Sequence, residues 1–232
     1  MMSLAPTRVG GMSKAGFFLT FEGGDGAGKS TQALALADHL WERFGVEVLV
    51  TFEPGDTTLG RDLRRLIQHG EDMDPRTEAL LYAADRAHHV ATVIRPALNR
   101  GAIVISDRYL DSSVAYQAAG RELAASEIER LSLWATEGLL PDATVLLDVD
   151  ETEALERQHG ELDRIEAAGA EFRARVRAGF LARAAADPKR WWVINGGGSV
   201  ADVHQEVIAA VEPLVSEWSA AENPLSDEVD LP

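Results

Sequence analysis

Short apolar runs alternate along this chain with segments of helical periodicity. The runs lie at 17–21, 46–52, 102–106, 143–149 and 191–194, and apolar residues in the intervening segments recur every three or four positions. Continuous apolar runs predict strands that are buried on both faces, and helical crossovers between them predict a parallel sheet. We therefore expect an α/β fold in which helices cover both faces of a five-stranded parallel sheet. In such folds ligands bind at the carboxyl ends of the strands.

The segments between the apolar runs carry signals for helix ends. Gly45 follows a helical pattern and is a typical residue after a helix C-terminus. Asp74-Pro75 predicts the start of a long helix that continues to about residue 100, in which Pro96 would introduce a kink. Residues 126–129 form a capping-box pattern ahead of another helix. Further helices are expected over 168–186 and 199–218.

Charge and composition exclude several classes of protein. The chain has 38 acidic and 22 basic side chains, a formal net charge of −16 and no cysteine. Such a surface repels nucleic-acid backbones, and the lack of cysteine excludes disulfides, cysteine zinc sites and thiol catalysis. No apolar run is long enough to span a membrane, and the N-terminal segment has no secretory signal core. We expect a cytoplasmic protein that binds neither nucleic acid nor a membrane.

The two ends of the chain differ in composition from the rest. Residues 1–15 predict a flexible leader, within which Met12 is an alternative start. Residues 219–232 are acidic and predict a disordered tail. Because residues 16–218 contain every predicted strand and helix, we expect a single domain there.

A glycine-rich segment lies between the first apolar run and the first helical pattern. Residues 23–30, GGDGAGKS, fit G-x4-G-K-[ST], which in a strand–loop–helix context binds nucleoside triphosphates such as ATP. Glycines let backbone amides approach phosphate oxygens, Lys29 would neutralise β- and γ-phosphate charge, and the Ser30 hydroxyl would ligate Mg²⁺. A turn that merely begins a helix is the alternative, although a lysine in the first turn opposes the helix dipole. The expected nucleotide-binding residues are Gly23, Gly24, Asp25, Gly26, Ala27, Gly28, Lys29, Ser30 and Thr31.

The third apolar run ends in Asp107-Arg108-Tyr109. At that place Asp107 can accept hydrogen bonds from metal-bound water or orient an acceptor, and Arg108 can hold a phosphate with two donors. A strand-end ion pair is the alternative. Other P-loop classes lack support, because no asparagine is followed by lysine, as in the guanine-reading N-K-x-D segment, and no L-S-G-G-Q segment is present. The class that remains is the small-molecule kinases.

Five segments, in this order and at this spacing, resemble the bacterial thymidylate kinases, a family of P-loop nucleoside monophosphate kinases. They are FEGGDGAGKST, TFEPGDT, GEDMDPRTEALLYAADR, DRYLDSSVAYQ and GELDRIE, and the resemblance extends from about residue 17 to 218. It implies a P-loop NTPase fold with a short lid, and transfer of the γ-phosphoryl group of ATP to dTMP, giving dTDP and ADP in dTTP biosynthesis. It also implies a homodimer, for which apolar residues of the predicted helices over 76–99 and 126–138 are available.

The resemblance implies that the middle segments recognise the base. Tyr82 matches the aromatic residue that stacks on thymine, and Arg86, one helical turn later, matches the residue that binds a base carbonyl. Ser113 and Gln117 match contacts to the pyrimidine edge, and Tyr116 matches the residue that crowds the ribose 2′ position. Each also has an ordinary alternative: a core tyrosine, a solvated helix arginine, or polar residues at the start of a helix.

Further matches concern the sugar and the acceptor phosphate. The resemblance implies that Asp25 and Glu53 lie near the sugar 3′-hydroxyl, and that Arg64 and Arg108 lie near the acceptor phosphate. The family usually reads R-E-P-G-G-T where this chain has F-E-P-G-D-T at 52–57. An arginine near the acceptor site is therefore absent, and an acid is added.

Phosphoryl transfer requires positive charge on the migrating group. Positions 24–27 contain no arginine, so the resemblance assigns this charge to a lid over about 156–166, with Arg157 and Arg164 as the catalytic arginines. A solvated charged loop is the alternative. The family usually has more arginine where Gln158 and His159 stand.

Two other functions stay open at this level. One is a kinase for another deoxynucleotide or a deoxynucleoside, and the other is a non-catalytic nucleotide-binding interaction module. The combination of Lys29, Ser30, Asp107 and Arg108 favours an enzyme.

Overall fold

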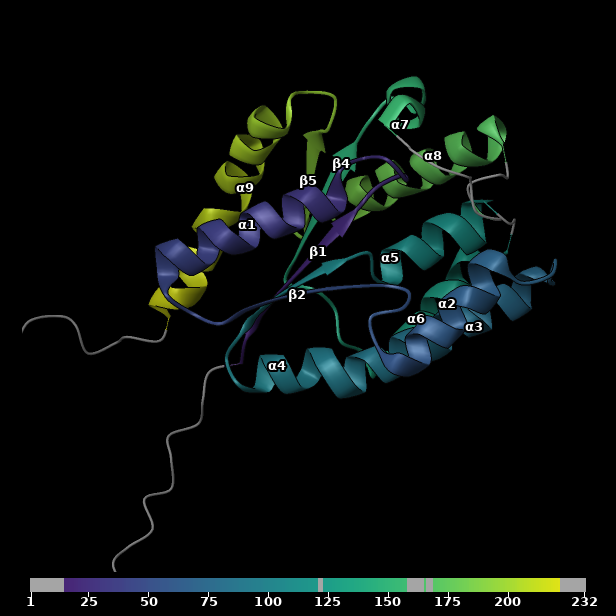
Figure 1. Cartoon of the computed structure of the whole chain (residues 1–232), viewed down its shortest axis with the longest axis horizontal. Helices are drawn as coiled ribbons and strands as arrows, with labels where there is room; N and C mark the ends of the chain where they lie inside the picture. The colour runs from purple at the N-terminus through teal and green to yellow at the C-terminus, as the bar shows by residue number, and fades with distance from the viewer. Residues whose placement is uncertain (1–14, 121–122, 158–164, 166–168, 222–232) are drawn as a thin grey trace, which may run out of the picture.

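The computed structural model describes residues 15–120, 123–157, 165 and 169–221. Within these ranges five strands form one parallel sheet in the order β2-β3-β1-β4-β5 (Figure 1). The predicted fold class and the five-stranded parallel sheet are confirmed. The strands are β1 (Phe17–Glu22), β2 (Val48–Phe52), β3 (Ile103–Asp107), β4 (Ala143–Asp148) and β5 (Trp191–Asn195).

Helices cover both faces of the sheet (Figure 1). On one face α1 (Lys29–Phe44) and α9 (Val200–Ala220) bury apolar residues against β1, with Leu19 of the strand inside this core. On the other face Phe18 packs with Val104 and with residues of the helical segment before β3. Because successive strand residues point to opposite faces, the continuous apolar runs supply the cores of both layers.

The remaining helical segments lie mainly at the carboxyl-terminal end of the sheet and on its second face (Figure 1). These segments are α2 (Thr58–His69), α3 (Pro75–His89), the π-helical turn η1 (Val90–Ile94), α4 (Arg95–Asn99), α5 (Leu110–Ser113), the π-helical segment η2 (Val114–Gly120), α6 (Ala125–Ala135), α7 (Glu151–Arg157) and α8 (Ala170–Ala186).

No helix of the described ranges is long and apolar enough to cross a membrane.

The strand register brings three loops together. β1 and β2 flank β3, and Phe21 and Phe52 are each in register with Asp107. The glycine-rich loop after β1, the Glu53 loop after β2 and the Arg108 loop after β3 therefore leave the same edge of the sheet side by side. Ligands of open parallel sheets bind at this edge.

Three details of the predicted helices need correction. The predicted helix to about residue 100 is present, since the backbone stays helical through α3, η1 and α4, but it contains the π-helical turn η1 directly before α4 and Pro96. The capping box at 126–129 is not formed, because α6 begins at Ala125, with Ala124 as its N-cap and no side-chain bond to it. Helix α2 was not predicted; its N-cap is Thr57, whose hydroxyl accepts from Gly60 N at 2.8 Å.

The predicted ends of the chain fall almost entirely outside the described residues. Only residue 15 of the expected leader is described. At the other end, residues 219–220, expected to begin the tail, form the last turn of α9. The predicted helix C-terminus at Gly45 is confirmed, because this residue adopts a left-handed conformation with φ 65° and donates to Trp41 O.

Candidate active site

The glycine-rich loop joins β1 directly to α1. Gly23 has φ 137°, and a Cβ atom there would lie 2.5 Å from Leu147 O of the neighbouring strand, so only glycine fits this position. Lys29, the first residue of α1, is buried, and its Nζ donates to Gly24 O at 2.7 Å. Burial lowers the pKa of Lys29 below its ordinary value. An incoming phosphate would restore the counter-charge that this lysine needs.

The loop and the end of β3 meet through Ser30 and Asp107. The Ser30 hydroxyl donates to Asp107 Oδ2, and both residues line a cavity of about 1110 Å³. Mg²⁺ prefers hard oxygen ligands and is commonly held by one or two protein oxygens together with substrate phosphates. No group of three His, Asp or Glu side chains that could hold a metal occurs in the part of the chain that the structure describes. One hydroxyl and one carboxylate therefore fit a magnesium ion that arrives with a nucleotide.

Arg108 connects the glycine-rich loop with the segment after β3. Its Nη2 lies 2.5 Å from Asp25 Oδ1, and its Nη1 donates to Gly23 O and to Ser112 Oγ, each at 3.0 Å. The Tyr116 hydroxyl donates to the other oxygen of Asp25 at 2.9 Å. Burial alone would raise the pKa of Asp25, but the charges of Arg108 and Lys29 hold it at about 2. Asp25 is therefore a carboxylate at neutral pH.

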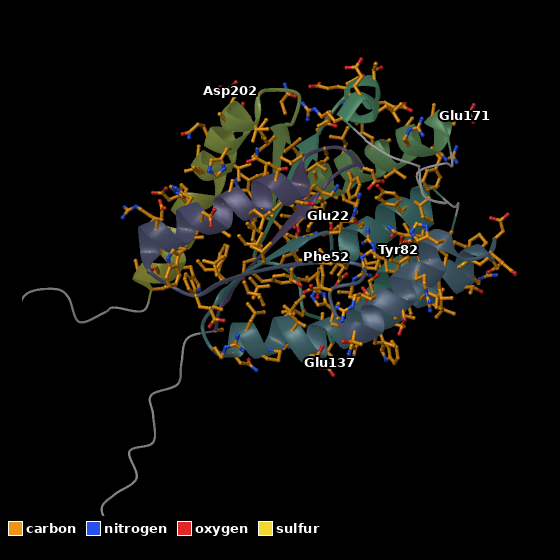
Figure 2. All side chains as sticks on the ribbon, viewed as in Figure 1. Glu22, Phe52, Tyr82, Glu137, Glu171 and Asp202 are labelled. Carbon is orange, nitrogen blue, oxygen red and sulfur yellow. The ribbon has the colours of Figure 1, made fainter. Side chains whose placement is uncertain are left out.

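A second cavity, of about 320 Å³, lies beside the first between α2, α3 and η2. Figure 2 shows Glu22, Phe52 and Tyr82 grouped near the centre of the molecule, where the strands end beside these helices. All of the residues that the sequence assigned to substrate binding line this second cavity. They are Asp25, Glu53, Arg64, Tyr82, Arg86, Arg108, Ser113, Tyr116 and Gln117.

Arg86 is one of the largest fully buried side chains of the described residues. Its Nε donates to Glu53 Oε2 at 2.7 Å, its Nη1 to Ser113 Oγ at 3.1 Å and its Nη2 to Tyr109 O at 3.1 Å. A solvated helix arginine is thereby excluded. These bonds fix the Arg86 guanidinium at the wall of the smaller cavity, where it can donate to a ligand carbonyl.

Gln117 presents an acceptor to the same cavity. Its Nε2 donates to Glu78 Oε1 at 3.2 Å, while its Oε1 is buried and has no hydrogen-bond partner among the described residues. A buried acceptor without a partner is unfavourable unless a ligand or water donates to it. The cavity thus offers one fixed donor and one fixed acceptor to a planar polar ligand.

Arg157 of α7 extends into the larger cavity. Its Nη1 donates to Gly196 O at 2.8 Å, and its Nη2 lies 2.5 Å from Glu153 Oε1. Arg164, together with Gln158 and His159 of the predicted lid, lies outside the described residues.

Comparison with known proteins agrees with this geometry. A family model described as "Thymidylate kinase" matches residues 21–207. The chain belongs to the thymidylate kinase family. A thymidylate kinase of Clavibacter sepedonicus is 53% identical over 89% of this chain and 99% of its own length, and one of Leifsonia xyli subsp. xyli is 55% identical over 84% and 94%. The crystal structure of a thymidylate kinase from Ehrlichia chaffeensis has a TM-score of 0.71 at 36% identity, covering 85% of this chain and 99% of that chain.

The function of the chain is that of a thymidylate kinase, an ATP-dependent enzyme of nucleotide biosynthesis. The resemblance, the activity and the enzyme class expected from the sequence are confirmed. The alternative of a non-catalytic nucleotide-binding module has no support from these relatives.

Sequence reasoning missed two buried residues of this thymidylate kinase. Glu22, at the end of β1, accepts from Tyr109 N at 2.9 Å and from Ser112 Oγ at 2.6 Å, so it holds the segment that follows Arg108. His89, at the end of α3, contacts Glu53 and Thr51. A signal for Glu22 exists in the sequence, because it is the one charged residue in the otherwise apolar run before the glycines.

Proposed function

We propose that the smaller cavity binds dTMP and the larger cavity binds ATP, so that the γ-phosphoryl group passes between them to give dTDP and ADP. The observation that carries this proposal is a shared wall: Asp25, Glu53, Arg64 and Arg108 line both cavities. In-line transfer requires the donor and acceptor phosphates to meet, and two arginines in the shared wall favour that meeting.

Base recognition rests on the hydrogen-bond pattern of the smaller cavity. Thymine offers a ring N–H between two carbonyls. Gln117 Oε1, which lacks a partner in the described structure, can accept from that N–H, and Arg86 can donate to a carbonyl. Tyr82 supplies the face on which the ring stacks, and Ser113 adds a contact to the pyrimidine edge. Tyr116 crowds the ribose 2′ position and favours deoxyribose, since its hydroxyl is held by Asp25.

The phosphates have their own set of residues in this proposal. The backbone amides of 23–31 and the Lys29 ammonium hold the β- and γ-phosphates of ATP. When ATP binds, the hydrogen bond from Lys29 to Gly24 O is replaced by one to a phosphate oxygen. Arg64 and Arg108 hold the dTMP phosphate. Ser30 would ligate Mg²⁺ and Asp107 would accept from metal-bound water, and the bound ion would supply positive charge against the phosphates.

Arg157 and Arg164 complete the catalytic group as lid arginines. Arg157 lines the ATP cavity at the end of α7, which supports its role. Positive charge on the migrating phosphoryl group is worth about 10³–10⁵ in rate in other P-loop enzymes. Because both substrates are intracellular nucleotides, the enzyme is expected to work in the cytoplasm.

A homodimer is also part of this proposal. Large apolar side chains are exposed on adjacent helices: Leu59 (47%) and Leu66 (48%) on α2 and Leu80 (57%) on α3. Such a surface is stabilised when a second copy covers it across a two-fold axis. Within the surface expected from the sequence, Trp134 on α6 is also exposed (78%), whereas Val90, Ile94 and Ile128 are buried within the chain.

Release of ADP with a panel of acceptors tests the substrate assignment. The panel is dTMP, dUMP, dCMP, AMP, GMP and thymidine, with the Lys29→Ala variant as the inactive control. We expect the largest kcat/KM for dTMP and almost no activity with thymidine, which lacks the acceptor phosphate. Equal activity with the purine monophosphates would refute the proposed base contacts.

A further inference from the structure

A buried chain of hydrogen bonds leads from the rim of the larger cavity to the smaller cavity. The Thr51 hydroxyl lies 2.5 Å from Asp56 Oδ2 and 2.6 Å from His89 Nε2. His89 Nδ1 lies 2.9 Å from Glu53 Oε1, and Glu53 Oε2 accepts from Arg86 Nε at 2.7 Å. Thr51 and His89 are each only 1% exposed, so water has almost no access to the bonds that His89 makes.

The number of protons in this chain is determined by its chemistry. A threonine hydroxyl has one proton, and an ionised carboxylate has none. If Thr51 donates to Asp56, then His89 Nε2 must donate to Thr51, and His89 Nδ1 must donate to Glu53. Every bond is satisfied only when His89 carries both ring protons, or when one of the two carboxyl groups is protonated in its place.

The surroundings favour the proton on His89. Arg86 is fully buried and needs Glu53 as its anion, so a neutral Glu53 would leave an unpaired charge. Asp56 is 31% exposed, and water therefore stabilises its ionised form. Asp85 is a further acid near His89, and burial raises the pKa of Asp85 to about 6. The charged groups that the structure shows against His89 are thus Glu53, Asp56, Asp85 and Arg86.

We infer that His89 is a positioning residue that carries both ring protons and holds Glu53, and through Glu53 the guanidinium of Arg86, in the geometry that receives the base. With His89 charged, each oxygen of Glu53 accepts from a cation, which fixes the carboxylate in one orientation. Arg86 then keeps its Nη1 at Ser113 and on the cavity wall. The consequence for dTMP rests on the proposed role of Arg86 in base binding.

The protonation state is measured without any activity assay. In ¹⁵N-labelled protein the imidazole nitrogens of His89 are identified by comparison with the His89→Gln variant, which is needed because the chain has six histidines. At pH 8 we expect both nitrogens of His89 to carry a proton in the unmodified chain, because each faces a hydrogen-bond acceptor. In Asp56→Asn the new amide donates to Thr51, Thr51 donates to Nε2, and His89 should be neutral with its proton on Nδ1. A neutral His89 in the unmodified chain, or a charged one in both proteins, would overturn the inference.

Steady-state kinetics test whether the contact between His89 and Glu53 contributes to binding of the dTMP base. An asparagine amide can occupy the place of Nδ1 and donate to Glu53, whereas a glutamine amide reaches only toward Thr51. We expect His89→Gln to raise the KM for dTMP about tenfold at pH 7, through the lost bond to Glu53, with the KM for ATP unchanged. His89→Asn should recover most of that loss. Equal effects of the two variants on both substrates would mean that His89 only supports the fold.

Failure of the proposed base site gives a different result. If Arg86 does not contact the base, His89 should still be charged at pH 8 in the unmodified chain, but neither His89 variant would change the KM for dTMP selectively. The spectroscopic measurement therefore tests the protonation of His89, and the kinetic measurement tests the proposed contact between Arg86 and the base. Asp56→Asn, on a partly exposed residue, keeps the test available if the His89 variants fold poorly.

Discussion

Arg108 and Asp25 form an ion pair, with 2.5 Å between Nη2 and Oδ1, although they follow different strands. Arg108 adopts a left-handed backbone conformation with φ 70°, which costs a residue with a side chain about 1 kcal/mol or more. The contacts of its guanidinium with Asp25, Gly23 and Ser112 offset that cost. The pair thus fixes the glycine-rich loop against the segment that carries Ser113 and Gln117, the proposed base contacts.

Arg108→Lys should lower kcat by orders of magnitude and raise the KM for dTMP. A lysine cannot bind Asp25, Gly23 O and Ser112 together, and it offers no fork to a phosphate. Steady-state ADP release measures both effects. Arg100→Lys is the matched control, because Arg100 pairs with Glu47 on the exposed surface and should leave the kinetics unchanged. An unchanged kcat in Arg108→Lys would contradict the assignment.

Arg86→Lys should weaken dTMP much more than ATP. The substitution keeps a cation beside Glu53 but removes the planar guanidinium that is proposed to donate to the base, a loss of roughly 1–3 kcal/mol, or about 5- to 150-fold in KM. The control is Arg76→Lys at the exposed start of the same helix. If the KM of both substrates rises equally, Arg86 supports the fold and does not select the base.

Several features of the site could be predicted from the sequence because each depends on neighbouring residues and on one topological rule. The glycine-rich loop, Asp107 and Arg108 follow strands that a parallel sheet must bring to one edge. The contact between His89 and Glu53 could not be predicted in this way. It joins residues 36 positions apart and depends on how α3 packs beside the loop after β2.

The wrong helix start at α6 has a similar physical cause. The capping-box pattern predicts that Ser126 precedes the helix, but the chain is already helical at Ala125. Ser126 therefore lies inside the first turn, where its side chain cannot act as the cap. A local pattern does not determine where tertiary packing allows a helix to begin.

Glu22 should make stability depend on pH. Burial, with Asp111 nearby, raises the pKa of Glu22 from 4.5 to about 7. Between these values the folded chain holds the proton and the unfolded chain releases it, so this group destabilises the fold as pH rises through that window. Glu22→Gln keeps the hydrogen-bond geometry of the neutral acid and does not titrate.

Urea unfolding at pH 5, 6, 7 and 8 measures this dependence. The free energy of unfolding of Glu22→Gln, minus that of the unmodified chain, should become more positive as pH increases. Glu42→Gln, at an exposed position of α1, corrects for the loss of one formal charge. A difference that stays constant with pH would show that Glu22 is ionised throughout.

Leu80→Glu should separate the proposed dimer into single chains. The new carboxylate would lie in an apolar interface and would cost far more there than on a monomer surface. Light scattering at micromolar concentration should give twice the chain mass of 25.1 kDa for the unmodified protein and the chain mass for the variant. Leu140→Glu, an exposed leucine outside α2 and α3, should stay dimeric. A monomeric unmodified protein would end this proposal.

Arg157→Ala should lower kcat by about 10³ while changing the KM for dTMP little, because the arginine acts on charge that develops during transfer. Its present partners, Gly196 O and Glu153, hold it in the larger cavity. Arg130→Ala on α6 is the control for loss of one cation.

Arg164→Ala should have the same effect as Arg157→Ala if both belong to the lid. The acidic chain repels an anionic substrate, so the few arginines near the phosphates must supply the attraction locally. If each variant alone keeps the kcat of the unmodified chain, the charge on the migrating group comes from elsewhere, and Arg108 and the arginines of α8 become the next residues to substitute. If only Arg157→Ala loses activity, α7 supplies the catalytic charge by itself, and the predicted role of Arg164 is wrong.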